Sequence, residues 1–165
     1  MSQKEHEDIR NATHDLNIVV VAENIRTPEN LGMIIRVSEA FGVKKVLFIG
    51  DKTADFSTKA KRAARHADQL LMFEFISDSD RLFEQLQHKN YRLIALEYTS
   101  SSQPITELKM AEKDHLAIVI GSERKGISAR ILKKMQSSHH IKMYGKNSSI
   151  NVVNALSIAL YQLVK

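Results

Sequence analysis

Three short stretches of this 165-residue sequence carry residue types that could do chemistry. In the first, Asn30, Gly32 and Arg36 lie in a segment with helical spacing, where a glycine costs about 1 kcal/mol relative to alanine. Because a helical side chain covers the preceding turn, Arg36 would lie over the bare backbone of Gly32. The pair could hold a guanidinium against a ligand that approaches the helix closely, or it could reflect packing alone.

The second stretch, IVIGSERKGIS, runs from an apolar strand-like segment into a polar turn. Gly121 would let a ligand approach the end of the strand, and Glu123 places a carboxylate beside it. The spacing from Gly121 to Gly126 fits neither a P-loop nor the dinucleotide-binding fingerprint. By itself, this spacing is also typical of an ordinary turn between a strand and a helix.

The third stretch predicts a helix over 149–164 whose start is rich in hydrogen-bonding groups. Residues 147–149 are expected to cap it. Asn151 and Asn154 are expected inside the helix, three positions apart on one side. Asparagine is a poor helix former, so both side chains need partners, which a neighbouring loop or a ligand could supply equally well.

The elements that must position these residues follow from hydrophobic patterning. Short β-branched runs alternate with helical periodicity, which predicts one α/β domain with a mostly parallel sheet and helices on both faces. Ligands of such sheets bind beyond the carboxyl ends of the strands. The expected strands are 17–22, 44–50, 70–75, 91–97, 115–121 and 140–145, and the expected helices are 28–41, 57–67, 78–89, 126–136 and 149–164, with the most loop-like stretch at 99–104.

Composition narrows the class of protein. Hydrophobic residues make up 43% and charged residues 26%, as in globular proteins, and the absence of cysteine excludes disulfides and thiolate metal sites. The histidines show no metal-ligand spacing, since the adjacent His139 and His140 would point to opposite sides of a strand. The apolar runs are too short to cross a membrane and the N-terminus has no hydrophobic signal core, so we expect a cytoplasmic protein.

Charge is distributed unevenly along the chain. Residues 1–16 form an acidic leader with a net charge of −2. Residues 17–165, the expected catalytic domain, have a net charge of +7, which gives +5 for the whole chain. A basic domain favours an anionic partner such as nucleic acid, although a mildly basic enzyme with no such partner has the same balance.

A basic cluster lies in the segment STKAKRAARHAD. The expected helix places Lys59, Arg62 and His66 on one face, with Lys61 and Arg65 adjacent. Such a face can bind phosphates without reading sequence, or it can simply be solvated.

Taken together, the three stretches resemble the motifs of the SpoU (TrmH) family of RNA ribose methyltransferases, within the SPOUT superfamily. The residues that match the first motif are Asn30, Gly32, Arg36 and AFG at 40–42; those that match the second are Gly121, Glu123 and Gly126; and those that match the third are Ile141, Met143, Gly145, Ser149, Asn151 and Val152. The chain departs from the third motif at Lys142, Ile150 and Val153, which replace the usual proline, leucine and serine.

The resemblance implies a SPOUT fold with a C-terminal trefoil knot, and S-adenosylmethionine (S-adenosyl-L-methionine) bound by the motif loops. The residues that it implies as cofactor contacts are Leu96, Glu97, Gly121, Ile141, Met143 and Ile150. It also implies a homodimer that packs through the C-terminal region and the first-motif helix, so that the helix at 149–164 is buried between subunits.

The implied reaction is methyl transfer to a ribose 2′-hydroxyl of tRNA or rRNA, with no metal. Arg36 would then be a charged clamp on the phosphate and developing oxyanion, and Gly32 would keep the backbone beneath it clear so that RNA can approach. The residues expected to position the arginine and the ribose are Asn30, Glu123, Ser149 and Asn151, and those expected to bind RNA are Arg36, Lys59, Arg62, Arg65 and Arg124.

With no base-reading contacts among these residues, we expect selection by RNA shape, with tRNA preferred over rRNA. Two other classes of protein are alternatives to this function. A catalytically inactive RNA-binding module could keep the same fold, although the intact motif residues argue against it. A nucleotide-dependent oxidoreductase is disfavoured because the dinucleotide-binding fingerprint is missing.

Overall fold

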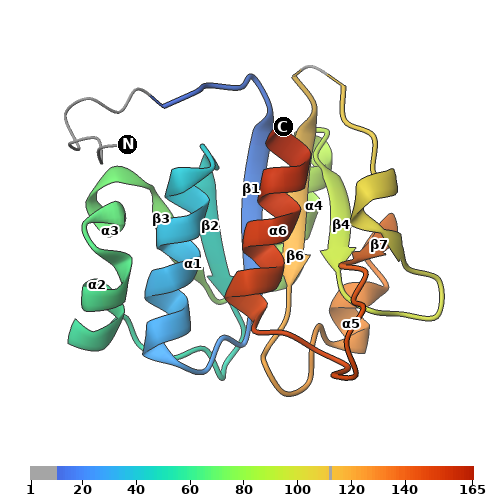
Figure 1. Ribbon diagram of the computed structural model, residues 1–165. Coiled ribbons are helices and arrows are strands. Elements are labelled where there is room, and N and C mark those ends of the chain that lie inside the picture. The colour runs from blue at the N-terminus through green and yellow to red at the C-terminus, as the bar shows by residue number, and fades with distance from the viewer. Residues whose placement is uncertain (1–10, 112) are drawn as a thin grey trace, which may run out of the picture.

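A parallel sheet of seven strands forms the middle layer of the domain, in a computed structural model that describes residues 11–111 and 113–165 (Figure 1). Every pairing in this sheet is parallel, and the strand order is β3-β2-β1-β6-β4-β7-β5. The strands are β1 (Asn17–Glu23), β2 (Lys45–Ile49), β3 (Phe73–Ile76), β4 (Arg92–Leu96), β5 (Gln103–Pro104), β6 (His115–Ile120) and β7 (Ser137–His140).

Helices cover both faces of the sheet, which confirms the predicted α/β fold. Alternate residues of β1 point to opposite faces, so Ile18 and Val20 join one core and Val19 and Val21 join the other. The first core lies under α1 (Pro28–Ala40), α2 (Thr58–Ala64), α3 (Ala67–Leu70), the 3₁₀ helix η2 (Ile105–Glu107) and α6 (Val152–Val164). The second lies under α4 (Ser79–His88) and α5 (Ala129–Leu132).

The expected strand at 140–145 is wrong by several residues. The strand is β7, whose Ser137–His139 pair with Ile94–Leu96 of β4, and residues 141–145 form a loop. Ile141 and Met143 alternate with polar residues as in a strand, but they line a pocket instead of a sheet face. The stretch 99–104, expected as a loop, contributes the short edge strand β5.

The helices expected at 57–67 and 126–136 are much shorter than the sequence pattern suggests. Helix α2 ends at Ala64 because Arg65 and His66 both adopt left-handed backbone conformations, with φ of 46° and 70°. His66 is therefore not on one helical face with Lys59 and Arg62, which corrects the expectation. The helix expected at 126–136 is reduced to α5, whose N-cap is Ser128.

Gly32 is a packing glycine, which corrects the role expected for it. A Cβ added at Gly32 would collide with the Ala60 carbonyl oxygen and would lie 2.8 Å from Ala63 Cβ and from Ala64 N. The backbone of α2 therefore crosses α1 at this position, and Gly32 is buried. The glycine makes room for another helix of the same chain, and RNA cannot approach the backbone there.

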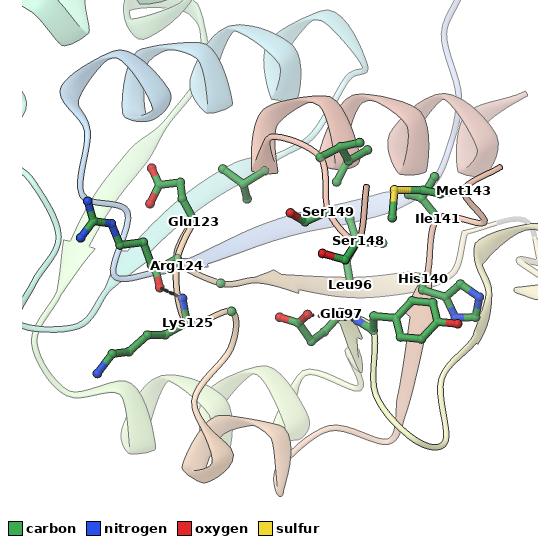
Figure 2. Close-up of a pocket in the computed structure, with 17 residues that line it drawn as sticks. Leu96, Glu97, Glu123, Arg124, Lys125, His140, Ile141, Met143, Ser148 and Ser149 are labelled. Carbon is green, nitrogen blue, oxygen red and sulfur yellow. Dashed lines mark hydrogen bonds between the residues drawn. The ribbon is translucent and has the colours of Figure 1, made fainter. Parts of the chain in front are cut away.

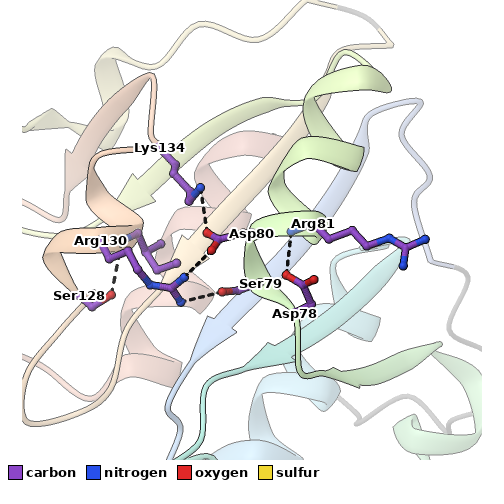
Figure 3. A network of polar contacts seen from close by, with 8 residues as sticks. Asp78, Ser79, Asp80, Arg81, Ser128, Arg130 and Lys134 are labelled. Atoms are coloured by element: carbon purple, nitrogen blue, oxygen red, sulfur yellow. Dashed lines mark hydrogen bonds and ion pairs between the residues drawn. The ribbon is translucent and has the colours of Figure 1, made fainter.

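On the second face, polar side chains connect α5 to the start of α4 (Figure 3). Arg130 donates hydrogen bonds to Asp80 at 3.0 Å and to Ser79 at 2.8 Å, and Lys134 forms an ion pair with Asp80 at 3.0 Å. The hydrogen bond from Lys134 is the main reason why the pKa of Asp80 lies below its ordinary value, and the Arg130 charge acts in the same direction.

The N-terminal part of the described chain also contacts the domain. A ring nitrogen of His14 lies 2.8 Å from the Phe41 carbonyl oxygen, and Leu16 is buried in the first core. Residues 1–10 of the expected acidic leader lie outside the described residues. None of the helices that the structure describes is long and apolar enough to span a membrane. The trefoil knot stays a prediction.

Candidate functional site

A pocket of about 400 Å³ lies at the carboxyl ends of β4, β6 and β7 (Figure 2). Three segments far apart in the sequence form its walls: the end of β4 with the residues after it, the loop after β6, and the segment that runs from the end of β7 into α6. The lining residues are Leu96, Glu97, Tyr98, Gly121, Ser122, Glu123, Arg124, Lys125, Gly126, His140, Ile141, Met143, Ser148, Ser149, Ile150, Val152 and Ala155. All six residues expected to contact a cofactor are among them.

Glu97 holds two of these walls together. One of its carboxylate oxygens accepts a hydrogen bond from the Tyr98 N–H at 3.0 Å, and the other accepts one from the Ile127 N–H at 3.0 Å. Gly126 has a left-handed φ of 60°, and a Cβ there would collide with the Glu97 carboxylate. The carboxylate therefore fixes the loop after β4 against the loop after β6.

The loop after β6 folds back on its own start. Ser122 and Gly126 exchange backbone hydrogen bonds of 3.1 and 2.9 Å. A Cβ added at Gly121 would collide with the Gly126 carbonyl carbon and the Ile127 nitrogen. That Gly121 makes room for a ligand stays a prediction; in the structure the glycine lines the pocket and makes room for the returning loop, which forms the pocket wall.

The pocket has an apolar side and a polar side. Leu96, Ile141 and Ile150 contribute aliphatic surface, whereas Ser148 and Ser149 contribute hydroxyl groups. Figure 2 shows Glu123, Arg124 and Lys125 gathered at one end and Met143, Ile141 and His140 at the other. Aliphatic walls close to backbone polar groups suit a flat heteroaromatic ring, and the charged end suits a ligand with an ionic part.

Tyr98 and His140 line the pocket although the sequence did not identify them as site residues. His140 Nδ1 lies 2.9 Å from the Ser102 hydroxyl, and the Tyr98 ring packs on the imidazole with centroids 4.5 Å apart.

His139, the neighbour of His140 in β7, does not line the pocket. Its side chain is buried, and this burial lowers its pKa. The two histidine side chains have different surroundings because neighbouring residues of a strand point to opposite faces of the sheet. The described residues contain no group of three His, Asp or Glu side chains placed to hold a metal ion.

A polar cluster beside the pocket joins all three motif stretches. Glu123 Oε1 accepts hydrogen bonds from Asn30 Nδ2 at 2.5 Å and from the Thr27 hydroxyl at 3.3 Å. Asn151 Nδ2 donates to Asn30 Oδ1 at 3.4 Å. Asn151 is the N-cap of α6, and its side chain accepts from the Val153 N–H at 2.8 Å. The helix therefore begins at Val152 and not at 149, so the position expected for Asn151 inside the helix and the caps expected at 147–149 are wrong. Thr27 is the N-cap of α1 and is not among the residues that the sequence analysis assigned to a site.

The residues expected to bind RNA are less closely grouped. Arg36 is exposed on α1, does not line the pocket, and forms no hydrogen bond or ion pair with the described residues. The expected contacts from Asn30 or Glu123 to this guanidinium are therefore not formed. Lys59 and Arg62 are exposed on α2, and Arg65 is exposed just after it, whereas Arg124 lines the pocket.

The fold and the site define a class of protein: an α/β domain with a ligand pocket at the carboxyl edge of a parallel sheet. The sequence matches the SpoU rRNA Methylase family over residues 17–161. This match covers most of the chain, and the chain therefore belongs to that family.

Known relatives agree with this assignment. The chain is 26% identical over 154 residues to the 23S rRNA (guanosine-2′-O-)-methyltransferase RlmB of Salmonella typhi, which covers 93% of this chain and 62% of that protein. The chain thus spans about 62% of the length of this relative.

Solved structures share the fold. The SpoU methyltransferase AviRb from Streptomyces viridochromogenes, in complex with the cofactor AdoMet, is similar with a TM-score of 0.82 and 20% identity, over 99% of this chain and 62% of that chain. A structure described as giving insights into the 2-OH methylation of C/U34 on tRNA is similar with a TM-score of 0.77 and 21% identity, over 90% of this chain and 93% of that one.

Proposed function

We propose that the chain binds S-adenosylmethionine in the 400 Å³ pocket and methylates a ribose 2′-hydroxyl of RNA. The observation that carries this proposal is the pocket itself, which the second and third motif stretches of a SpoU family member line, next to the polar cluster that joins them to the first stretch. The cofactor would supply a methyl group on a sulfonium, which is activated for in-line displacement.

The lining residues fit such a cofactor. A volume of about 400 Å³ is in the range of small-molecule sites. The aliphatic side chains of Leu96, Ile141 and Ile150 suit an adenine ring, and the carboxylates of Glu97 and Glu123 suit a cationic sulfonium. The Glu97 carboxylate also orders two walls, so its loss would disturb the pocket as well as its charge.

The side chains beside the pocket would act on the ribose. A ribose hydroxyl is a weak nucleophile, so its proton must leave or its developing charge must be stabilised. Asn30, Glu123 and Asn151 are held in one hydrogen-bonded cluster, which is suited to orienting the hydroxyl. Arg36 would remain charged, since a guanidinium does not release its proton at neutral pH, and it would contact the substrate phosphate.

The proposal extends to the partners. Ile158 and Tyr161 on α6 are 45% and 63% exposed, which supports a homodimer that covers this helix. We propose a folded RNA as the substrate, tRNA before rRNA, in a cytoplasmic setting. The structure that concerns tRNA methylation supports this preference, because it is similar over 93% of its own chain, whereas RlmB is a longer protein.

Methyl transfer from tritiated S-adenosylmethionine to total tRNA and to total rRNA tests this function. We expect label in RNA, in an alkali-resistant dinucleotide that identifies a 2′-O-methyl group. Binding of cofactor and RNA without any transfer would instead show the inactive RNA-binding module. Label in rRNA but not in tRNA would overturn the substrate preference alone.

A further inference from the structure

A second cavity, of about 320 Å³, lies at the carboxyl ends of β1 and β2. The turn after β1, the turn after β2 and the loop after β6 form its walls. It shares Ser122, Lys125 and Gly126 with the first pocket, so the loop after β6 separates the two cavities. Figure 2 shows the Lys125 side chain directed away from Glu97 and Ser149.

Three cations from three different turns line this second cavity. Arg26, Lys52 and Lys125 are all exposed, and none forms an ion pair with any residue that the structure describes. Two acids, Glu23 and Asp51, line it as well. Glu23 is buried and its carboxylate accepts the Ser128 N–H at 2.8 Å, so part of its hydrogen-bonding capacity is already used within the protein. A net positive charge remains.

The turns that carry these cations are tied to one another. Asn24 has a left-handed φ of 54°, and its side-chain oxygen accepts the Lys52 N–H at 2.9 Å. The Asn24 N–H donates to the Ile49 carbonyl at 2.9 Å, and the Ala54 N–H donates to the Ile25 carbonyl at 2.7 Å. The backbones beneath Arg26 and Lys52 are thus held together before any ligand arrives, which lowers the entropic cost of binding.

We propose that the second cavity binds a backbone phosphate of the RNA substrate, adjacent to the nucleotide that is methylated. This inference rests on the proposed function. Cations around an open polar cavity suit a phosphodiester, and contacts of this kind fix the register of a nucleic acid without reading its bases. Because Lys125 lines both cavities, a phosphate bound in the second lies next to the occupant of the first.

The test is a double variant, Arg26→Gln with Lys52→Gln, which keeps the side chains long and removes two charges. We expect RNA affinity in filter binding to fall about tenfold or more, and the slope of log affinity against log salt to become shallower by about 0.7 to 0.9 for each lost phosphate contact. The KM for RNA should rise while kcat and the affinity for S-adenosylmethionine stay close to wild type.

Two further variants make the result specific. Arg81→Gln on α4 with Lys89→Gln at its C-cap removes the same charge from exposed positions on the second face and should leave RNA affinity unchanged. Arg26→Lys with Lys52→Arg keeps both charges and should restore most of the affinity. Thermal unfolding of all three proteins checks that each is folded.

The outcomes separate the two proposals. If the wild type methylates RNA and the Gln double variant binds RNA as the control does, this inference is wrong and the proposed function stands. If the wild type neither binds nor methylates RNA, both are wrong. Inorganic phosphate is the competing ligand: if it binds the wild type and not the double variant while RNA affinity is equal in both, the cavity is a free-anion site and the inference is overturned.

Discussion

The two faces of the sheet differ in the surface that their helices present. On the face under α4 and α5, Asp80 pairs with Arg130 and with Lys134 (Figure 3). On the face under α1 and α6, visible in the front of Figure 1, Arg36 has no partner among the described residues, and Ile158 is exposed. Arg81 on α4 also forms no ion pair with the described residues, so the feature that distinguishes the face under α1 and α6 is its exposed apolar surface.

This difference indicates where function is located. Asn30 is on α1 and Asn151 caps α6, so the polar cluster at the pocket is built from the face that carries the exposed apolar surface. An uncovered apolar patch adds nothing to the stability of an isolated chain, so its presence on this face points to binding there.

Arg36→Ala should give the largest effect on activity. We expect methyl transfer to fall at least about 100-fold, as when one charge-stabilising donor is removed from an active site. Affinity for S-adenosylmethionine, measured by calorimetry, should hardly change because Arg36 does not line the pocket. Arg81→Ala on α4 is the matched control, since it removes an exposed arginine from the other face of the sheet. Retention of most of the activity in Arg36→Ala would show that the exposed arginine has no role in transfer.

Gly32→Ala should give the largest effect on stability. The new Cβ would press against Ala60 and Ala64 of α2, and overpacking of this kind costs about 1–3 kcal/mol of unfolding free energy. Gly145→Ala is the control, since a Cβ there meets no atom within 4 Å. Urea denaturation compares the two. Equal midpoints would mean that α1 and α2 do not pack as described.

Ile158→Lys with Tyr161→Lys should convert a dimer to a monomer in sedimentation velocity at micromolar concentration. Two charges on the outer side of α6 would have to be desolvated in an interface. Leu70→Lys with Met72→Lys is the matched control, because these side chains are 74% and 62% exposed outside α6. A wild type that is already monomeric would show that the apolar patch on α6 is not a subunit interface.

Asp80→Asn should give the smallest effect, limited to the second face. The pKa of Asp80 is lowered in the folded protein, chiefly by its hydrogen bond with Lys134, so its stabilising contribution is present above its unfolded pKa and is lost as the pH falls through the folded value. Wild type and variant should therefore differ slightly in urea midpoint at neutral pH and converge in acid. A constant difference at all pH values would contradict this.

Much of the fold and the pocket was predictable because the signals are local. Continuous β-branched runs gave the central strands, and the glycine and asparagine spacings gave three stretches that meet at one edge of the sheet. Leu96 and Ile150 line the same pocket, as the family resemblance implied. The roles of these residues in binding and transfer stay predictions.

The rest depends on contacts between distant parts of the chain. The group that excludes a side chain at Gly32 is on α2, about 30 positions away, so spacing within α1 could not reveal it. His140 forms a hydrogen bond with Ser102, and Glu97 accepts one from the Ile127 N–H; in each pair the two residues are far apart in the sequence. Arg26 and Lys52 meet only because β1 and β2 are neighbours. Polar residues scattered along a sequence become a site only once the strand order is known.

The pairing of β1 with β6 has a consequence for how the chain acquires its structure. Residues 17–22 find their partner at 115–120, so one edge of β1 stays unpaired while nearly a hundred further residues are synthesised. Contacts this distant in sequence slow folding, because a long loop must close before they form. A ribosome-bound nascent chain that lacks β6 would thus expose an apolar strand edge. The protein should therefore refold slowly and become resistant to protease only after β6 has emerged.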